Sequence, residues 1–117
     1  MLIVDDSPEV RNGLQSMLTT HPDIEVVGEA EDGLRALTMA AELQPDIILM
    51  DSQMPIMDGV EATRHIKERL PNIKILVLTV HEMYIEPSLA AGADACLMKD
   101  VTSQELLSTI RRLVGRA

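Results

Sequence analysis

The sequence predicts an α/β domain in which helices cover both faces of a parallel sheet. Short apolar runs alternate with longer stretches whose apolar residues recur with helical spacing. One of the short runs, residues 47–50, is apolar throughout, which is typical of a strand covered on both faces. Five such strands alternate with five helices, and this alternation favours parallel strands joined by helical crossovers.

The five strands are expected at the short apolar runs, and the first and last helices have the clearest start signals. Ser7 and Pro8 suit the N-cap and the first position of a helix. Thr102 and Glu105 have the spacing of a capping box. We place the strands at residues 2–4, 24–27, 47–50, 73–78 and 95–98.

The remaining helices are predicted from apolar spacing and from breakers. The third helix is expected at residues 59–70. Because proline lacks an N–H and clashes with the preceding turn, Pro87 moves the expected start of the fourth helix from Glu82 to near Glu86, and Gly92 suits its end. The apolar stripes expected to face the core are Val10, Leu14, Met17 and Leu18; Leu34, Leu37 and Ala41; Ala62, Ile66 and Leu70; and Leu106, Leu107, Ile110, Leu113 and Val114.

Composition narrows the class of protein further. The chain has 117 residues, 46% of them hydrophobic, which suits one domain with its own core. A single cysteine excludes a disulfide framework and fits a reducing cytoplasm. No apolar run is long enough for a membrane span, and the net charge of −9 disfavours contact with nucleic-acid phosphates. We therefore expect a cytoplasmic domain that contacts neither membranes nor nucleic acid.

Polar side chains follow four of the five predicted strands. The carboxyl ends of parallel strands meet at one edge of a sheet, and ligands bind there in doubly wound folds. The flavodoxin-like strand order 2-1-3-4-5 would gather these side chains at that edge. Each alone suits a turn, a helix cap or a solvated end, but their joint occurrence favours a site. They are Asp5 and Asp6 after the first strand, then Asp51, Thr79 and Lys99.

These residue types predict phosphoryl transfer to Asp51. Three clustered carboxylates raise one another's pKa unless a cation compensates their charge, and Mg²⁺ prefers such oxygen ligands. A carboxylate can accept a phosphoryl group as a nucleophile. An ammonium such as that of Lys99 stabilises the charge of the transferring group, and the Thr79 hydroxyl can donate to one of its oxygens.

Several motifs have the same spacing as those of a known family. They are Ile-Val-Asp-Asp at residues 3–6, Asp-x-x-Met-Pro-Ile-Met-Asp-Gly at residues 51–59, Leu-Thr at residues 78–79, and Gly-Ala-Asp at residues 92–94 before Lys99. With these motifs the chain resembles, over essentially its whole length, the response-regulator receiver domain of two-component signalling.

The resemblance implies a role for each site residue. Asp51 would accept a phosphoryl group from a histidine of a sensor kinase. Lys99 would contact this group, and Thr79 would move toward it as the switch. The implied Mg²⁺ ligands are Asp6, Asp51 and the backbone carbonyl of Gln53, with Asp5 acting through water.

Asp100, directly after Lys99, makes the chain similar to the NarL/FixJ (LuxR-type) subclass. Members of this subclass usually carry a C-terminal helix-turn-helix DNA-binding domain. We therefore expect residues 1–117 to be a single receiver domain excised from a longer regulator, with a linker starting at residues 115–117; a stand-alone receiver is the alternative. The implied partners are the sensor histidine kinase, the output domain and a second copy, bound through the fourth helix, fifth strand and last helix or through the first and last helices.

Some positions depart from the family pattern or leave a choice open. Cys96 replaces the usual aromatic switch residue, so we expect switching to rely on Thr79 and residues 80–86, with Cys96 as a small packing residue. Val80 is interpreted either as narrowing access to Asp51 or as ordinary packing. Gln53 either positions water near the aspartyl-phosphate or is solvated, Tyr84 is a candidate partner contact, and Ser52 is expected to have little consequence.

Two other classes of function were weighed against the switch. A pseudo-receiver that binds partners without phosphorylation predicts a replaced Asp51 or Lys99, and both are retained. A phosphatase or nucleotide-binding enzyme predicts a second aspartate two residues after Asp51 or a glycine-rich phosphate loop, and the sequence has neither. We expect a domain that assists only its own phosphorylation and dephosphorylation and is not otherwise an enzyme.

Overall fold

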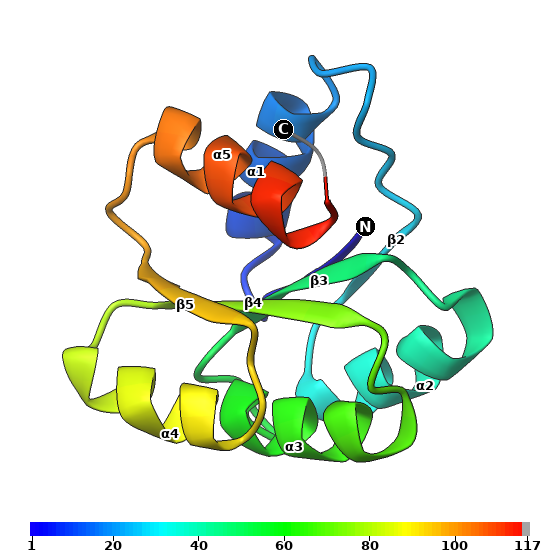
Figure 1. Ribbon diagram of the computed structural model, residues 1–117, viewed down its shortest axis with the longest axis vertical. Helices are drawn as coiled ribbons and strands as arrows, with labels where there is room; N and C mark the ends of the chain where they lie inside the picture. Colours follow the sequence, from blue (N-terminus) through cyan, green and yellow to red (C-terminus); the bar gives the residue numbers. More distant parts are fainter. Residues whose placement is uncertain (116–117) are drawn as a thin grey trace.

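The computed structural model describes residues 1–115 and confirms the predicted fold class and strand order. The parallel sheet has five strands in the order β2-β1-β3-β4-β5. Helices α1 and α5 cover one face, and α2, α3 and α4 cover the other (Figure 1). The strands are β1 (Leu2–Val4), β2 (Gly28–Ala30), β3 (Ile47–Asp51), β4 (Lys74–Thr79) and β5 (Ala95–Met98). The helices are α1 (Pro8–Leu18), α2 (Gly33–Leu43), α3 (Gly59–Arg69), the short 3₁₀ helix η1 (Glu82–Tyr84), α4 (Ile85–Ala90) and α5 (Ser103–Leu113).

The core consists of two apolar layers, one on each face of the sheet. Because successive side chains of a strand point to opposite faces, Ile48 and Met50 enter the layer beneath α2 and α3, whereas Ile47 and Leu49 enter the layer beneath α5. All four are at most 2% exposed. The continuously apolar run thus identified a strand covered on both faces, as predicted.

The second strand was predicted four residues too early. Residues 24–27 lie outside the ladder, and the ladder starts where Gly28 lies opposite Leu2. The Val27 N–H donates to the Met1 carbonyl over 2.8 Å, and the Met1 amino group donates to the Glu25 carbonyl over 2.8 Å. The apolar alternation at residues 24–27 reflects the packing of Ile24 and Val26 on the core.

The buried face of α2 also differs from its predicted stripe. Leu34 is 51% exposed and Ala41 is exposed, whereas Ala36 and Ala40 are fully buried. The start of the helix determines this orientation. The Gly33 N–H donates to the Met57 carbonyl over 3.0 Å, and a Cβ at Gly33 would clash with that carbonyl. This close approach turns the small residues of α2 inward.

Capping follows the predictions at both ends of the chain. The Ser7 hydroxyl accepts from the Val10 N–H at the start of α1, and the Thr102 hydroxyl accepts from the Glu105 N–H at the start of α5.

The α-helix before β5 begins at Ile85, one residue before the predicted Glu86, but η1 precedes it from Glu82 and was not predicted. Residues 116–117, part of the expected linker, lie outside the described residues.

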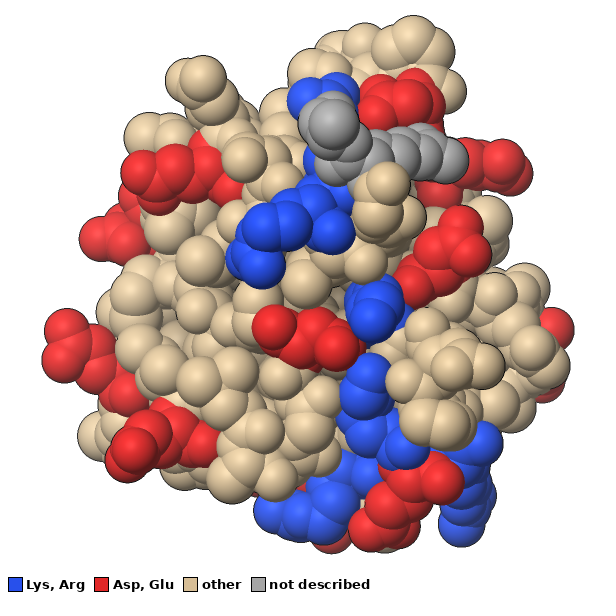
Figure 2. Space-filling model, viewed as in Figure 1, with Lys and Arg blue, Asp and Glu red and all other residues tan. Residues whose placement is uncertain are grey.

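Charged side chains of both signs are mixed on the surface. On the face in Figure 2, Lys and Arg side chains form a broken band between the levels of α5 and α3, interrupted by acidic side chains. Among residues 1–115, no helix is sufficiently long and apolar to cross a membrane.

Candidate functional site

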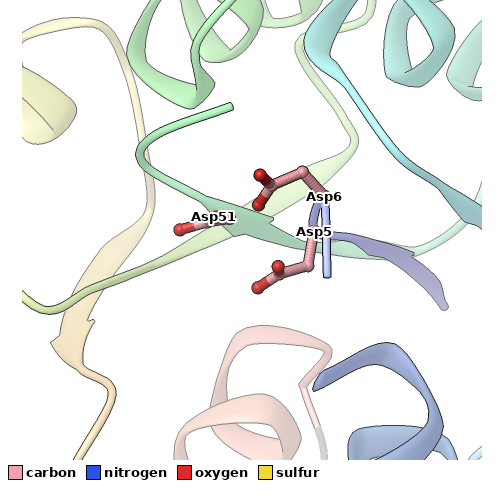
Figure 3. Close-up of side chains that lie close together, drawn as sticks. All are labelled: Asp5, Asp6 and Asp51. Atoms are coloured by element: carbon pink, nitrogen blue, oxygen red, sulfur yellow. The ribbon is translucent and has the colours of Figure 1, made fainter. Parts of the chain in front are cut away.

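The structure brings three carboxylates together at the carboxyl edge of the sheet. Asp5 and Asp6 follow β1, and Asp51 ends the neighbouring strand β3, in which Met50 lies opposite Val4. One carboxylate oxygen from each of the three aspartates lies within 4.8 Å of the others. Figure 3 shows the three side chains projecting toward the same side of the sheet edge. Asp5 and Asp51 are buried and Asp6 is exposed, so the cluster is open to solvent through Asp6.

Lys99 supplies a positive charge to this cluster from the loop after β5. Its Nζ lies 3.0 Å from Asp5 Oδ2 and 3.1 Å from Asp51 Oδ1. Its backbone N–H donates to the Thr79 carbonyl over 2.8 Å, which fixes the start of the Lys99 side chain beside β4. The ammonium therefore bridges two carboxylates that come from strands far apart in the sequence.

Charge in the site is unbalanced. Burial raises the pKa of the Asp51 carboxyl, the nearby Asp5 charge adds to this, and Lys99 opposes both. For Lys99, burial opposes the charged form, but the hydrogen bonds to Asp5 and Asp51 and the negative charges of these residues together raise the pKa of the ammonium. Lys99 pairs with two of the three clustered carboxylates, so a bound divalent cation would relieve the excess negative charge.

The hydroxyl of Thr79 is engaged away from Asp51. Thr79 is fully buried at the end of β4, and its Oγ1 accepts from the Ser52 hydroxyl over 2.9 Å. It also accepts from the His81 N–H over 3.1 Å and donates to the His81 carbonyl over 3.2 Å. Of the five polar residues expected to gather at the sheet edge, four therefore meet directly, and Thr79 lies beside them with its hydroxyl already used.

The contact of Ser52 with Thr79 was not predicted. We expected this residue to have little consequence, but its side chain is 1% exposed and donates to Thr79. A signal for the contact was present in the order of residues: Ser52 follows the end of β3, and Thr79 ends the neighbouring strand.

Gln53 makes a contact that neither interpretation of it included. Its side-chain amide donates to the Tyr84 hydroxyl over 2.9 Å. This hydrogen bond joins the loop after β3 to η1. The single aromatic residue of the chain is thus tied to the loop that follows the candidate phosphoacceptor.

The loop between β3 and α3 explains the spacing of the longest motif. The Gly59 N–H donates to the Ser52 carbonyl over 3.0 Å, and a Cβ at Gly59 would collide with the Asp51 carbonyl. Asp58 caps α3 by accepting from the Glu61 N–H over 2.8 Å. Only glycine permits this close approach, and it holds the backbone of Asp51 against the start of α3.

Two departures from the family pattern have clear environments. Cys96 is partly buried and packs on the apolar layer that includes Val77 and Ala93, and burial raises the pKa of its thiol. This environment fits a small packing residue. Val80 is 57% exposed, so interior packing does not explain it, and its effect on access to Asp51 stays a prediction.

The fold and the site together define a class of protein: doubly wound α/β domains with an acidic cluster and a lysine at the carboxyl edge of the sheet. The family model described as the response regulator receiver domain matches residues 1–111. Response regulator protein VraR of Staphylococcus aureus is 45% identical over 114 residues, covering 96% of this chain and 54% of VraR. The chain therefore belongs to the response regulator receiver domain family, whose members are typically signalling domains rather than enzymes.

Solved structures agree with this assignment. A two-component response regulator of the LuxR family from Aurantimonas sp. has a TM-score of 0.91 and 36% identity, covering 98% of this chain and 84% of that one. CheY of Borrelia burgdorferi, solved in a complex with CheX, BeF₃ and Mg²⁺, has a TM-score of 0.87 and 26% identity, covering 96% and 86%. The chain spans about half the length of the curated relatives that it matches.

Proposed function

We propose that Asp51 accepts a phosphoryl group from a histidine of a sensor kinase in a Mg²⁺-dependent reaction, and that this modification controls an output. The observation that supports this best is the position of the Lys99 ammonium, 3.1 Å from Asp51 Oδ1 within the carboxylate cluster. A purely structural ion pair would not need two further carboxylates beside it.

The transfer is a displacement at phosphorus. A carboxylate oxygen of Asp51 attacks, the new O–P bond forms as the P–N bond to the kinase histidine breaks, and the leaving imidazole keeps the electron pair and regains its proton from water. The Lys99 ammonium pairs with the Asp51 carboxylate before the transfer, and we expect it to pair with the phosphoryl oxygens afterwards. In this proposal Asp51 is the nucleophile and Lys99 is the preorganised positive charge.

The donor set also fits Mg²⁺. Carboxylate oxygens within 4.8 Å of one another are the hard ligands that this ion prefers, and the exposed Asp6 leaves room for the water molecules that it retains. We propose Asp6, Asp51 and the Gln53 carbonyl as ligands, with Asp5 acting through water. When bound, the ion would neutralise charge on the phosphoryl oxygens. The Mg²⁺ and BeF₃ in the similar CheY complex support the assignment.

We further propose that this receiver controls a C-terminal helix-turn-helix DNA-binding domain in a longer cytoplasmic regulator. The support is the length of VraR relative to this chain and the similarity to a DNA-binding response regulator of the LuxR family from Staphylococcus aureus, with a TM-score of 0.89 and 28% identity. The faces offered for pairing with a second copy are α4, β5 and α5, or α1 and α5.

Intact mass spectrometry tests the central proposal. Incubation with Mg²⁺ and acetyl phosphate should add one phosphoryl group to the native chain and none to Asp51→Ala. Omission of Mg²⁺ or addition of EDTA should abolish the gain, whereas Asp46→Ala, an acidic position outside the cluster, should be modified like the native chain. A native chain that stays unmodified would favour the pseudo-receiver interpretation.

A further inference from the structure

Ser52 occupies an unusual place: it directly follows the proposed phosphoacceptor and touches the proposed switch. Its side chain is 1% exposed, and its hydroxyl donates to Thr79 Oγ1 over 2.9 Å. A buried hydroxyl needs a partner, because an unpaired one loses the hydrogen bonds that water would have given it. In this structure Thr79 is that partner.

The register of the sheet explains why these two side chains meet. Asp51 pairs with Leu78 in the β3–β4 ladder, and the Ser52 N–H extends the ladder by donating to the Leu78 carbonyl over 3.1 Å. The next two positions, Ser52 and Thr79, are therefore neighbours. Since side chains alternate between faces, both lie on the face opposite to that of Asp51.

The hydrogen-bonding capacity of Thr79 is exhausted in this arrangement. A hydroxyl has one proton to donate and two lone pairs to accept with. Thr79 Oγ1 donates to the His81 carbonyl and accepts from the His81 N–H and from Ser52. It cannot donate to a phosphoryl oxygen on Asp51 until the bond to the His81 carbonyl breaks and the hydroxyl turns toward Asp51.

We propose that Ser52 is a positioning residue that holds Thr79 in its resting position and so sets how readily a phosphoryl group on Asp51 engages it. This inference rests on the proposed function of Asp51. When Thr79 leaves, the Ser52 hydroxyl stays buried without its acceptor, so the bond favours only the resting state. A contact made only in the resting state shifts the equilibrium between the resting and engaged positions of Thr79 by the free energy of that contact. For this hydrogen bond the expected shift in the equilibrium constant is roughly 5- to 100-fold.

The test compares the affinity of the native chain and Ser52→Ala for beryllofluoride, a phosphoryl mimic, in the presence of Mg²⁺. The titration is followed through the backbone amide resonances of Thr79 and His81. We expect Ser52→Ala to bind roughly 5- to 100-fold more tightly, and we expect Ser52→Thr, which keeps the hydroxyl, to bind as the native chain does. A merely structural role would lower the melting temperature without tightening binding.

A double-mutant cycle with Thr79→Val makes the test specific. Without the Thr79 hydroxyl there is nothing for Ser52 to hold, so the effect of Ser52→Ala should vanish in the Thr79→Val background. An effect of equal size in both backgrounds would overturn the inference, because Ser52 would then act on something other than Thr79.

The remaining outcomes are also decisive. If the native chain binds beryllofluoride and folded Ser52→Ala binds it no more tightly, the role of Ser52 is overturned while that of Asp51 stands. If the native chain does not bind beryllofluoride, the proposed function fails and this inference fails with it. Should Ser52→Ala not fold, Ser52→Cys replaces it, because a thiol is a weaker donor, and an unchanged affinity in that variant overturns the inference.

Discussion

Two lysine–aspartate pairs lie at opposite edges of the same sheet and differ in how their charges are balanced. At the carboxyl edge, Lys99 lies 3.0 Å from Asp5 and 3.1 Å from Asp51. At the amino edge, Lys67 Nζ lies 3.0 Å from Asp94 Oδ2. The side chains of both lysines are mostly buried, at 26% and 17% exposed, so exposure does not separate them.

The two pairs differ in whether their hydrogen bonds and charges are complete. Lys67 also donates to the Pro71 and Ile73 carbonyls, and Asp94 also accepts from the Ile75 N–H, so one positive and one negative charge are fully satisfied by the protein. Lys99 instead shares its one charge among an excess of carboxylates. The Lys67–Asp94 pair, whose charges and hydrogen bonds are satisfied within the protein, stabilises the fold. The cluster at Lys99, which has too little positive charge, is suited to bind a cation.

Removal of the ammonium at the carboxyl edge is expected to have the largest effect. Lys99→Met should slow phosphorylation by acetyl phosphate about 100-fold, because preorganised charges that stabilise a transferring group contribute on this scale. The rate of phosphoryl incorporation at saturating Mg²⁺, measured by intact mass, checks this. A rate within threefold of the native one would show that Lys99 does not stabilise the transfer.

The equivalent change at the amino edge should affect stability instead. Lys67→Met should lower the free energy of unfolding by about 2 kcal/mol, because Asp94 keeps a partly buried charge without its partner. Urea denaturation measures the loss, with Arg64→Met at an exposed position of the same helix as the control. The rate of phosphorylation should equal that of the native chain. A slower rate would show that the Lys67–Asp94 pair also affects the phosphorylation site.

Neutralisation of the phosphoacceptor should stabilise the domain. Burial raises the pKa of Asp51, so its ionised form is disfavoured in the folded state, and Asp51→Asn should raise the free energy of unfolding at pH 7 without Mg²⁺ by about 1 kcal/mol. Asp51 loses its proton at a lower pH in the unfolded chain than in the folded one. The free energy of unfolding of the native sequence therefore falls as pH rises from the unfolded-state to the folded-state pKa of Asp51.

The advantage of Asp51→Asn should therefore be absent below the unfolded-state pKa of about 4 and complete above the folded-state pKa. Thermal unfolding of both chains across this pH range measures the difference. A constant difference at all pH values would mean that the ionisation of Asp51 is not its source.

The smallest effect is expected at the link between Gln53 and Tyr84. Tyr84→Phe removes the hydroxyl that holds the Gln53 amide, so the amide becomes free to orient water near the aspartyl-phosphate. The lifetime of phosphorylated Asp51 should fall by about two- to fivefold, as befits one exposed hydrogen bond. In a Gln53→Ala background, Tyr84→Phe should not shorten the lifetime further. An equal fall in lifetime in that background would show that Tyr84 acts independently of Gln53.

Features determined by local chemistry were predictable from the sequence, and features determined by packing between distant segments were not. Ser7 and Thr102 cap their helices as expected because a cap depends on three or four consecutive residues. The gathering of Asp5, Asp51 and Lys99 was also predictable, because carboxyl ends of parallel strands share one edge of a sheet.

Errors arose where a partner from elsewhere in the chain decides the outcome. The second strand begins at Gly28 because Leu2 is its first partner in the ladder, and no local pattern reveals this register. The buried face of α2 depends on the contact between Gly33 and the Met57 carbonyl. Ser52 was dismissed for the same reason, since its importance depends on the register between β3 and β4 rather than on its own neighbours.

Contacts with the rest of the domain fix the length of the segment between Asp51 and Gly59. At its far end Gly59 packs against the backbone of Asp51, and two residues earlier the Met57 carbonyl accepts from the Gly33 N–H. One residue more or fewer there would separate these contacts and displace Asp51, which lies at the start of the segment. Insertions and deletions directly behind the phosphoacceptor are therefore changes that this site does not tolerate.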